Sequence, residues 1–338
     1  MNALKKLKSN FLFHYRALRD ISDGKWDFCV LAADYLYCRL RFGVTHYEYL
    51  NFGFYDFSDH YRKNFLLKKH RKKYHHIQTK FFTLSKYTFY RRIPDLYRRE
   101  VLLAPHCGQE RFLEFLKKHK TIIIKPDTGC VGRGVEKVEY TDDTAALEVF
   151  ATFDKTSPTI CEELIRQHEV LSRLHPYCVN TVRVLSLLQD DEVHILAATL
   201  KIGTDPGSLV ENKKGKGLAA DVDTQTGIVT SYGMDGHCNR IVHHPVSGVQ
   251  IIGIQIPCWQ EALTLVKEAH KRLPQCRFYG WDIAITEDGP DIVEANGTPA
   301  DRASQAISRT PKGGKIIPLL KKNRLKQKNP KFEPNYDD

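Results

Sequence analysis

The sequence predicts a protein of the mixed α+β class, and three patterns support this prediction. Between residues 4 and 50 the apolar residues recur at helical spacings, without any alternation of strand and helix. After residue 120 the chain changes to short β-branched or alternating runs, such as those over 180–189 and 193–202. Residues 280–296 form two further apolar runs joined by an Asp-Gly-Pro turn, which is typical of a β-hairpin. Helices are therefore expected at the start of the chain and antiparallel strands beyond it.

Composition limits the class of protein. The chain has 338 residues, of which 42% are apolar, so it is long enough for two domains with sizeable cores. Its nine cysteines include no CxxC pair, which favours a reducing compartment. The first 18 residues carry lysines but no long uncharged apolar stretch, so neither a signal peptide nor a membrane-spanning helix is indicated. We expect a cytoplasmic protein.

Charge is distributed unevenly along the sequence. Residues 1–120 hold 25 Lys and Arg against 11 Asp and Glu, whereas residues 121–320 hold 20 against 26. The first 120 residues also contain 25 of the 36 aromatic residues. Such a segment fits an anionic membrane surface, an acidic substrate or nucleic acid, or it consists of solvated basic helices around an aromatic core. Because no nucleic-acid motif accompanies it, sequence-specific binding to nucleic acid is not expected.

The hairpin over residues 280–296 carries candidate metal ligands. Glu294 and Asn296 are two residues apart and share a face of their strand, and the hairpin brings Asp282 beside them. Carboxylate and amide oxygens suit Mg²⁺, which takes one or two carboxylates together with the phosphates of a nucleotide. The alternative is a surface hairpin with solvated carboxylates. A phosphate site elsewhere in the chain would decide between them.

A candidate phosphate site lies between two predicted strands. The run TIIIK ends at Lys125, the loop DTGCVGRG covers residues 127–134, and a second strand follows over 135–140. Glycines let backbone N–H groups approach phosphate oxygens, and the lysine supplies positive charge. The loop has neither the spacing of a Walker motif nor the strand-to-helix context of a Rossmann motif. An ordinary hairpin turn is the alternative.

Two basic residues interrupt apolar strands. Arg183 and Lys201 lie within the runs NTVRVLSLLQ and VHILAATLKI. Buried charges need partners, so each side chain is expected to meet either an anionic ligand or an internal carboxylate. The glycine- and lysine-rich segment over residues 208–219 would suit a mobile loop over a ligand.

Together these runs resemble the ATP-grasp superfamily, and in particular its sugar-transfer-associated branch, which is related to α-L-glutamate ligases. The similarity extends over roughly residues 79–320. Individually weak, the motifs are specific in combination. They are Lys80, IIIKP, DTGCVGRG, CEELI at 161–165, NTVRV at 180–184, the loop from Glu211 and Asn212 to Gly217, a VDxxTG hairpin, and the terminal WDIAI and VEAN.

The resemblance implies an ATP-grasp fold, in which two α+β subdomains clamp ATP, here with a helical and basic N-terminal region. The implied domains are residues 1–78, residues 79–320 divided at 165, and a basic tail over 321–338. The branch pattern is broken at Glu211, where Asp is expected, and at Lys216, which interrupts a glycine run. These departures bear on the acceptor substrate more than on ATP.

The resemblance also implies roles for individual residues around ATP and two Mg²⁺ ions. The phosphates would be contacted by Lys80, Lys125 and a flap formed by Gly129, Gly132, Arg133 and Gly134. The hinge, with backbone to adenine and a carboxylate to ribose, would be Glu162, Glu163, Leu164 and Ile165. The metal ligands would be Asp282, Glu294 and Asn296, and the residues that serve catalysis would be Arg183, Lys201 and Asn212.

The implied chemistry is activation of a carboxylate to an acyl phosphate, followed by attack of an amine. The substrates would be a small-molecule carboxylate and an amine. They would be linked to sugars if the enzyme modifies bacterial surface polysaccharide. A kinase that phosphorylates a sugar or small molecule would share every ATP-binding residue. A non-enzymatic ATP-binding module is disfavoured, because Lys125, Asp282, Glu294 and Asn296 are all present. The basic N-terminal region would dock on the inner surface of the membrane, bind an anionic sugar or nucleotide-sugar substrate, or only pack against the core. A cytoplasmic protein, peripheral to the inner membrane in the first case, is therefore expected.

Overall fold

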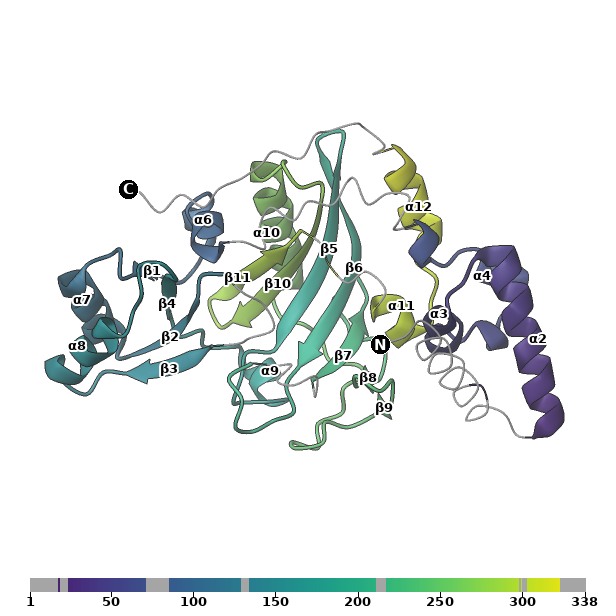
Figure 1. Ribbon diagram of the computed structural model, residues 1–338, viewed down its shortest axis with the longest axis horizontal. Coiled ribbons are helices and arrows are strands. Elements are labelled where there is room, and N and C mark those ends of the chain that lie inside the picture. The colour runs from purple at the N-terminus through teal and green to yellow at the C-terminus, as the bar shows by residue number, and fades with distance from the viewer. Residues whose placement is uncertain are drawn as a thin grey trace, which may run out of the picture. The chain divides into compact units, whose positions relative to one another are not determined.

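The computed structural model describes residues 18, 24–70, 85–128, 134–210, 217–297, 299 and 303–322 (Figure 1). The chain divides into two compact units. Unit 1 combines residues 1–75 with residues 301–322, and unit 2 combines residues 76–300 with residues 323–338. This division differs from the domain expected over residues 79–320, because residues 301–322 group with the N-terminal region.

Unit 1 is helical in its described part. Its elements are α2 (Lys25–Phe42), α3 (His46–Asn51), η1 (Phe54–Asp56), α4 (Asp59–Arg62), α11 (Ala303–Ser308) and α12 (Gly313–Lys322). A capping box starts α3, where the Thr45 hydroxyl accepts from the Glu48 backbone N–H and the Glu48 carboxylate accepts from the Thr45 backbone N–H. Aromatic side chains fill the core, as expected for basic helices around an aromatic interior. Fully buried examples are Tyr49, Phe52, Phe54 and Phe65.

One glutamine ties the C-terminal helices of unit 1 to its N-terminal part. The buried Gln305 side chain accepts from the Leu66 backbone N–H at 2.9 Å and donates to the Leu66 carbonyl at 3.0 Å. Its oxygen also accepts from the Lys312 backbone N–H at 3.1 Å. These bonds satisfy backbone groups that no strand or helix pairs, so residues far apart in sequence form one core.

Unit 2 begins with a small antiparallel sheet in the strand order β1-β4-β2-β3. The strands are β1 (Val101–Ala104), β4 (Thr159–Glu163), β2 (Thr121–Pro126) and β3 (Glu136–Glu139), preceded by α6 (Lys86–Tyr90) and η4 (Pro94–Leu96). The helices α7 (Gln109–His119) and α8 (Asp143–Ala151) supply apolar side chains to its core. The buried face of α7 carries Phe112, Phe115 and Leu116.

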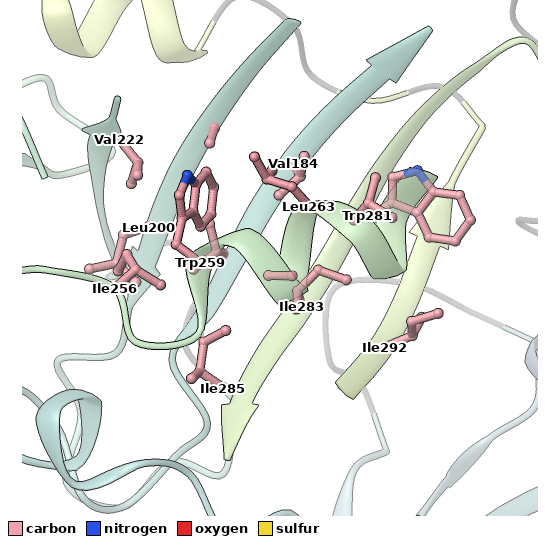
Figure 2. Close-up of a cluster of buried hydrophobic side chains, with 14 of the residues drawn as sticks. Val184, Leu200, Val222, Ile256, Trp259, Leu263, Trp281, Ile283, Ile285 and Ile292 are labelled. Atoms are coloured by element: carbon pink, nitrogen blue, oxygen red, sulfur yellow. The ribbon is translucent and has the colours of Figure 1, made fainter. Parts of the chain in front are cut away.

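A larger sheet completes unit 2, in the order β11-β10-β5-β6-β7-β8-β9. Its strands are β5 (Thr181–Gln189), β6 (Glu192–Ile202), β7 (Leu218–Val222), β8 (Gly233–Met234), β9 (Arg240–Ile241), β10 (Phe278–Thr286) and β11 (Gly289–Asn296), and α9 (Glu169–Ser172) precedes them. The helix α10 (Trp259–Arg272) packs against one face, where Trp259 and Leu263 meet Val184, Leu200 and Ile283 (Figure 2). The opposite face of the central strands carries the polar residues considered below.

Two apolar segments, residues 228–232 and 249–256, form no strand ladders. Isolated bridges replace them, such as the one between Ile228 and Gln255. Gly253 adopts a left-handed φ of 90°, which interrupts the extended run. The apolar residues there still reach the core, and Ile251 and Ile256 are buried. Among the described helices, none combines the length and apolar character needed to cross a membrane.

Candidate active site

Strand register places the candidate residues on one face of the larger sheet. Asp282 on β10 pairs directly with Glu294 on β11 and with Arg183 on β5. Thr181, two residues before Arg183, pairs with Lys201 on β6. Directly paired residues of antiparallel strands share a face, and so do residues two apart. The intervening residues, such as Val182 and Trp281, point to the core beneath α10.

Both basic side chains on this face contact the Asp282 carboxylate. Arg183 holds it through two donors, with Nε on one oxygen and a terminal nitrogen 2.5 Å from the other. Lys201 Nζ lies 3.2 Å from Asp282 Oδ2. Burial opposes ionisation of this carboxyl, but Arg183 and Lys201 outweigh burial and hold its pKa below the usual range. Of the two alternatives in the sequence, the internal ion pair is therefore present for both residues.

Glu294, which pairs with Asp282, has its pKa shifted in the opposite direction. Burial raises the pKa of Glu294, and the negative charge on Asp282 adds to this effect. Asn296 donates from its amide nitrogen to Glu294 Oε1 at 3.0 Å, while Arg183 lies 3.9 Å from the same oxygen. Two facing carboxyl groups beside an amide form a hard oxygen donor set that a divalent cation would stabilise.

This donor set is small. Within the described ranges, no three His, Cys, Asp or Glu side chains gather into a metal-binding group. A cation held by Asp282, Glu294 and Asn296 would therefore need further oxygens from a ligand or water. Mg²⁺ with nucleotide phosphates matches that requirement, since it is usually bound through one or two carboxylates plus phosphate oxygens.

A second charged cluster surrounds Lys125 on β2. Lys125 Nζ lies 2.7 Å from Glu162 Oε2, and Arg99 lies 3.1 Å from the other Glu162 oxygen. Arg99 also binds Asp291 Oδ2 at 2.6 Å and the Ile292 carbonyl at 2.7 Å. Burial opposes ionisation of Glu162, but the two cations lower its pKa. Arg99 thus connects the small sheet to β11 of the larger one through buried charges.

The other predicted hinge residues follow Glu162 along the chain. Glu163 ends β4 and accepts from the Glu100 backbone N–H at 3.3 Å, so its carboxylate is directed away from that of Glu162. Leu164 and Ile165 lie in the irregular segment after the strand and are partly buried. The Glu162 carboxylate is engaged by Lys125 and Arg99. The contacts of the hinge backbone with adenine and of a hinge carboxylate with ribose stay predictions.

The glycine loop is described only at its two ends, residues 127–128 and Gly134. Gly134 has a left-handed φ of 70°, and a Cβ placed there would lie 3.0 Å from the Pro126 ring. Both features favour glycine at this position. Five predicted site residues lie outside the described part of the chain, namely Lys80, Gly129, Gly132, Arg133 and Asn212.

Lys86 is a candidate that the sequence reasoning missed. Its Nζ donates to the carbonyls of Pro126 and Asp127 at 3.0 and 3.2 Å, at the start of the glycine loop. Burial lowers its pKa, the nearby charge of Lys125 adds to the shift, and Glu294 acts in the opposite direction. Lys86 thus lies within electrostatic reach of both charged clusters. No sequence signal separates it from other lysines, because α6 meets the loop only through tertiary packing.

Comparison with known proteins identifies the family. A family model described as sugar-transfer associated ATP-grasp matches residues 67–307, and the chain therefore belongs to this family. The expected α+β ATP-grasp fold is confirmed by this match. No curated protein matches the sequence.

Solved structures of low sequence identity are also similar. The ATP-grasp ligase PsnB, solved with a minimal precursor, Mg and ADP, is 16% identical, with a TM-score of 0.42 over 70% of this chain and 58% of that chain. D-alanine–D-alanine ligase from Bacillus anthracis is 15% identical, with a TM-score of 0.39 over 72% of this chain and 69% of that chain. N5-carboxyaminoimidazole synthase from Aspergillus clavatus is 9% identical, with a TM-score of 0.41 over 71% and 52%. The chain thus spans less than two thirds of the length of PsnB.

Proposed function

We propose that this protein is an ATP-dependent ligase. It would transfer the terminal phosphoryl group of ATP to a carboxylate, releasing ADP, and an amine would then displace phosphate from the acyl phosphate to form an amide. The observation that carries the proposal is the shared face of Asp282, Glu294 and Asn296 with Arg183 and Lys201. Oxygen donors for a cation and donors for an anion lie side by side there. Membership of the ATP-grasp family supports ATP as the phosphoryl source.

The residues fit a magnesium–nucleotide complex. The Asp282 and Glu294 carboxyls face each other, and burial together with the charge of Asp282 raises the pKa of Glu294, so a divalent cation would favour its ionised form. When bound, MgATP would supply the transferable phosphoryl group and a positive counter-charge. Lys125, oriented by Glu162, would present its ammonium group to phosphate oxygens. We further propose Lys80, the loop residues Gly129, Gly132, Arg133 and Gly134, and the hinge over residues 162–165 as nucleotide contacts.

Arg183 has the geometry of a charge-neutralising group. Asp282 holds its guanidinium through two hydrogen bonds, which fixes the plane of the group on the sheet face. In this position it would stabilise charge on the substrate carboxylate and the transferred phosphoryl group, with Lys201 beside it. We further propose Asn212 as a residue that serves catalysis. Positioning and neutralisation suffice for this chemistry, so no nucleophilic side chain is required.

The biological setting is also a proposal. The family description associates these proteins with sugar transfer, which supports a role in bacterial surface-polysaccharide or related peptide modification. We place the protein in the cytoplasm, against the inner membrane, because its excess positive charge lies in unit 1.

The test is ADP formation by the full-length protein with MgATP and a panel of acids and amines. We expect ADP release that requires both an acid and an amine, and a hydroxamate when hydroxylamine replaces the amine. ADP release with a sugar, without hydroxamate, would instead identify a kinase. AMP release, or no turnover over a broad panel, would reject the ligase.

A further inference from the structure

The helix α2 is apolar on two faces, although only one of them packs within unit 1. Cys38 and Phe42 are buried in the unit, where Phe42 meets Phe54. A second stripe is open to solvent, with exposed fractions of 64% for Val30, 56% for Leu36 and 79% for Leu40. Contiguous apolar side chains on a protein surface mark an interaction site. We therefore expect a partner to cover the outer stripe of α2.

The members of this outer stripe follow helical spacing. Positions 30, 33, 37 and 40 are separated by three or four residues, and Leu36 lies beside them, so all occupy one side of the helix. They are Val30, Ala33, Leu36, Tyr37 and Leu40, each of them exposed. Helical geometry puts the exposed Arg39 on one side of this stripe and the exposed Arg41 on the other. An apolar stripe with a basic edge on each side is the pattern of a helix that lies in the interface of a bilayer.

The net positive charge of unit 1 indicates an anionic partner. Its sequence holds 21 Lys and Arg against 8 Asp and Glu, whereas unit 2 holds 30 against 32. Several acids of unit 1 are engaged internally. Asp34 pairs with Arg62 at 2.8 Å and Asp56 with Arg309 at 3.0 Å.

Two further carboxylates of unit 1 are engaged in the same way. Asp59 lies 3.3 Å from Arg62, and it also accepts from the Tyr37 hydroxyl. Glu48 accepts from the Lys68 backbone N–H at 2.5 Å. Four of the eight acids of unit 1 are thus engaged within it, and its excess of 21 basic over 8 acidic residues makes the net field at its surface positive.

We propose that the outer stripe of α2, Val30, Ala33, Leu36, Tyr37 and Leu40 between Arg39 and Arg41, docks this protein on an anionic lipid bilayer. Self-association through the same stripe would bring two strongly positive units together, whereas an anionic bilayer neutralises them. The apolar side chains would enter the boundary between headgroups and acyl chains, and the two arginines would reach the headgroups. This inference rests on the proposed location at the membrane and is independent of the ligase chemistry.

The test is flotation of the full-length protein with vesicles of phosphatidylcholine alone or with one third phosphatidylglycerol. The wild type should float with the anionic vesicles and not with the neutral ones. Leu40→Glu should weaken this binding by at least about tenfold, since it puts a charge in place of an apolar side chain that would enter the bilayer. Arg41→Gln should weaken it by about fivefold. The controls are Val246→Glu and Arg173→Gln, which alter exposed residues of unit 2 and should bind as the wild type does.

The results distinguish docking through the outer stripe of α2 from membrane location in general and from the ligase chemistry. If the wild type floats and Leu40→Glu floats equally well, the stripe is not the docking surface. If the wild type does not float with anionic vesicles, the membrane location is rejected as well. If Leu40→Glu instead converts a dimer to a monomer in light scattering, the occupant is a second copy of the chain. ADP formation measured without vesicles should be the same in all variants, so that failure of the ligase proposal would be seen separately.

Discussion

Asp282 and Glu294 lie directly opposite each other across the β10–β11 hairpin, yet their proton affinities are shifted in opposite directions. Asp282 is neutralised by Arg183 and Lys201, whereas Glu294 is disfavoured as an anion by burial and by the charge of Asp282. A cation bound by this pair would therefore stabilise the ionised form of Glu294 more than that of Asp282. This makes Glu294 the more informative position for testing the proposed metal role.

Glu294→Gln should lower ADP formation by about 100-fold or more, because an amide is a weaker ligand for Mg²⁺ than a carboxylate. The shape of the side chain is kept and repulsion with Asp282 is removed, so the melting temperature should fall by no more than about 3 °C. Steady-state ADP formation and thermal melts measure the two effects. Glu287→Gln, in the exposed turn of the same hairpin, is the matched control and should retain activity. Full turnover by Glu294→Gln would refute the assignment.

Lys125→Met and Lys86→Met should both weaken use of ATP, but to different extents. Lys125 is oriented by Glu162 at 2.7 Å, so its loss should reduce kcat/KM for ATP by about 100-fold. Lys86 is anchored on the carbonyls before the glycine loop, so its loss should raise the KM for ATP by about tenfold with little change in kcat. The exposed Lys117→Met is the control. An unchanged KM in Lys86→Met would assign that lysine a structural role alone.

Arg99→Met should destabilise the fold by about 3 kcal/mol, because it leaves the buried Asp291 and Glu162 without a shared cation. Urea unfolding monitored by tryptophan fluorescence gives the free energy of unfolding. The control is Arg272→Met, which removes exposed contacts to Asp95 and Glu268 and should cost less than about 1 kcal/mol. Equal losses in the two variants would show that burial of Arg99 adds nothing to the strength of its ion pairs.

The sequence predicted the part of the site that depends on local pattern. The tight turn brings the strands of Asp282 and Glu294 side by side, as predicted. The turn alone would oppose Asp282 to residue 293, and a register shift between Asp282 and Ile283 makes Glu294 its direct partner. The strands expected over residues 180–189 and 193–202 follow in the same way from alternating apolar residues, and they are β5 and β6. Such features depend on neighbours a few residues away, and they were correct.

Contacts between distant segments could not be read from the pattern. Arg99 reaches Asp291 across 192 residues, and Gln305 reaches Leu66 across 239 residues. Arg99 looks like any other basic residue in a charged stretch, and only the packing of β1 beside β4 reveals its partners. The grouping of residues 301–322 with unit 1 has the same origin, because one buried amide satisfies backbone groups far away in the sequence.

His270 is a buried base whose tautomer is fixed by its neighbours. It lies on α10 beneath the sheet, where Nε2 donates to the Cys276 carbonyl at 3.1 Å and Nδ1 accepts from the Ser186 hydroxyl at 2.7 Å. The Trp281 indole N–H donates to the same hydroxyl at 2.8 Å. Both ring nitrogens are thus used in the neutral form. Burial lowers the pKa of His270 from 6.5 to about 4.

Acidification should therefore destabilise the protein through His270. The unfolded chain takes up a proton near pH 6.5, while the folded one does so only near pH 4, so the stabilisation is complete above about pH 6.5 and declines as the pH falls towards 4. Between about pH 7 and about pH 5 this single group should lower the free energy of unfolding by roughly 2 kcal/mol. Urea unfolding at the two pH values measures the loss. His270→Gln cannot titrate, so its loss over the same interval should be smaller by that amount, even though the variant is less stable at neutral pH. An equal pH dependence in the variant and the wild type would show that folding does not lower the pKa of His270.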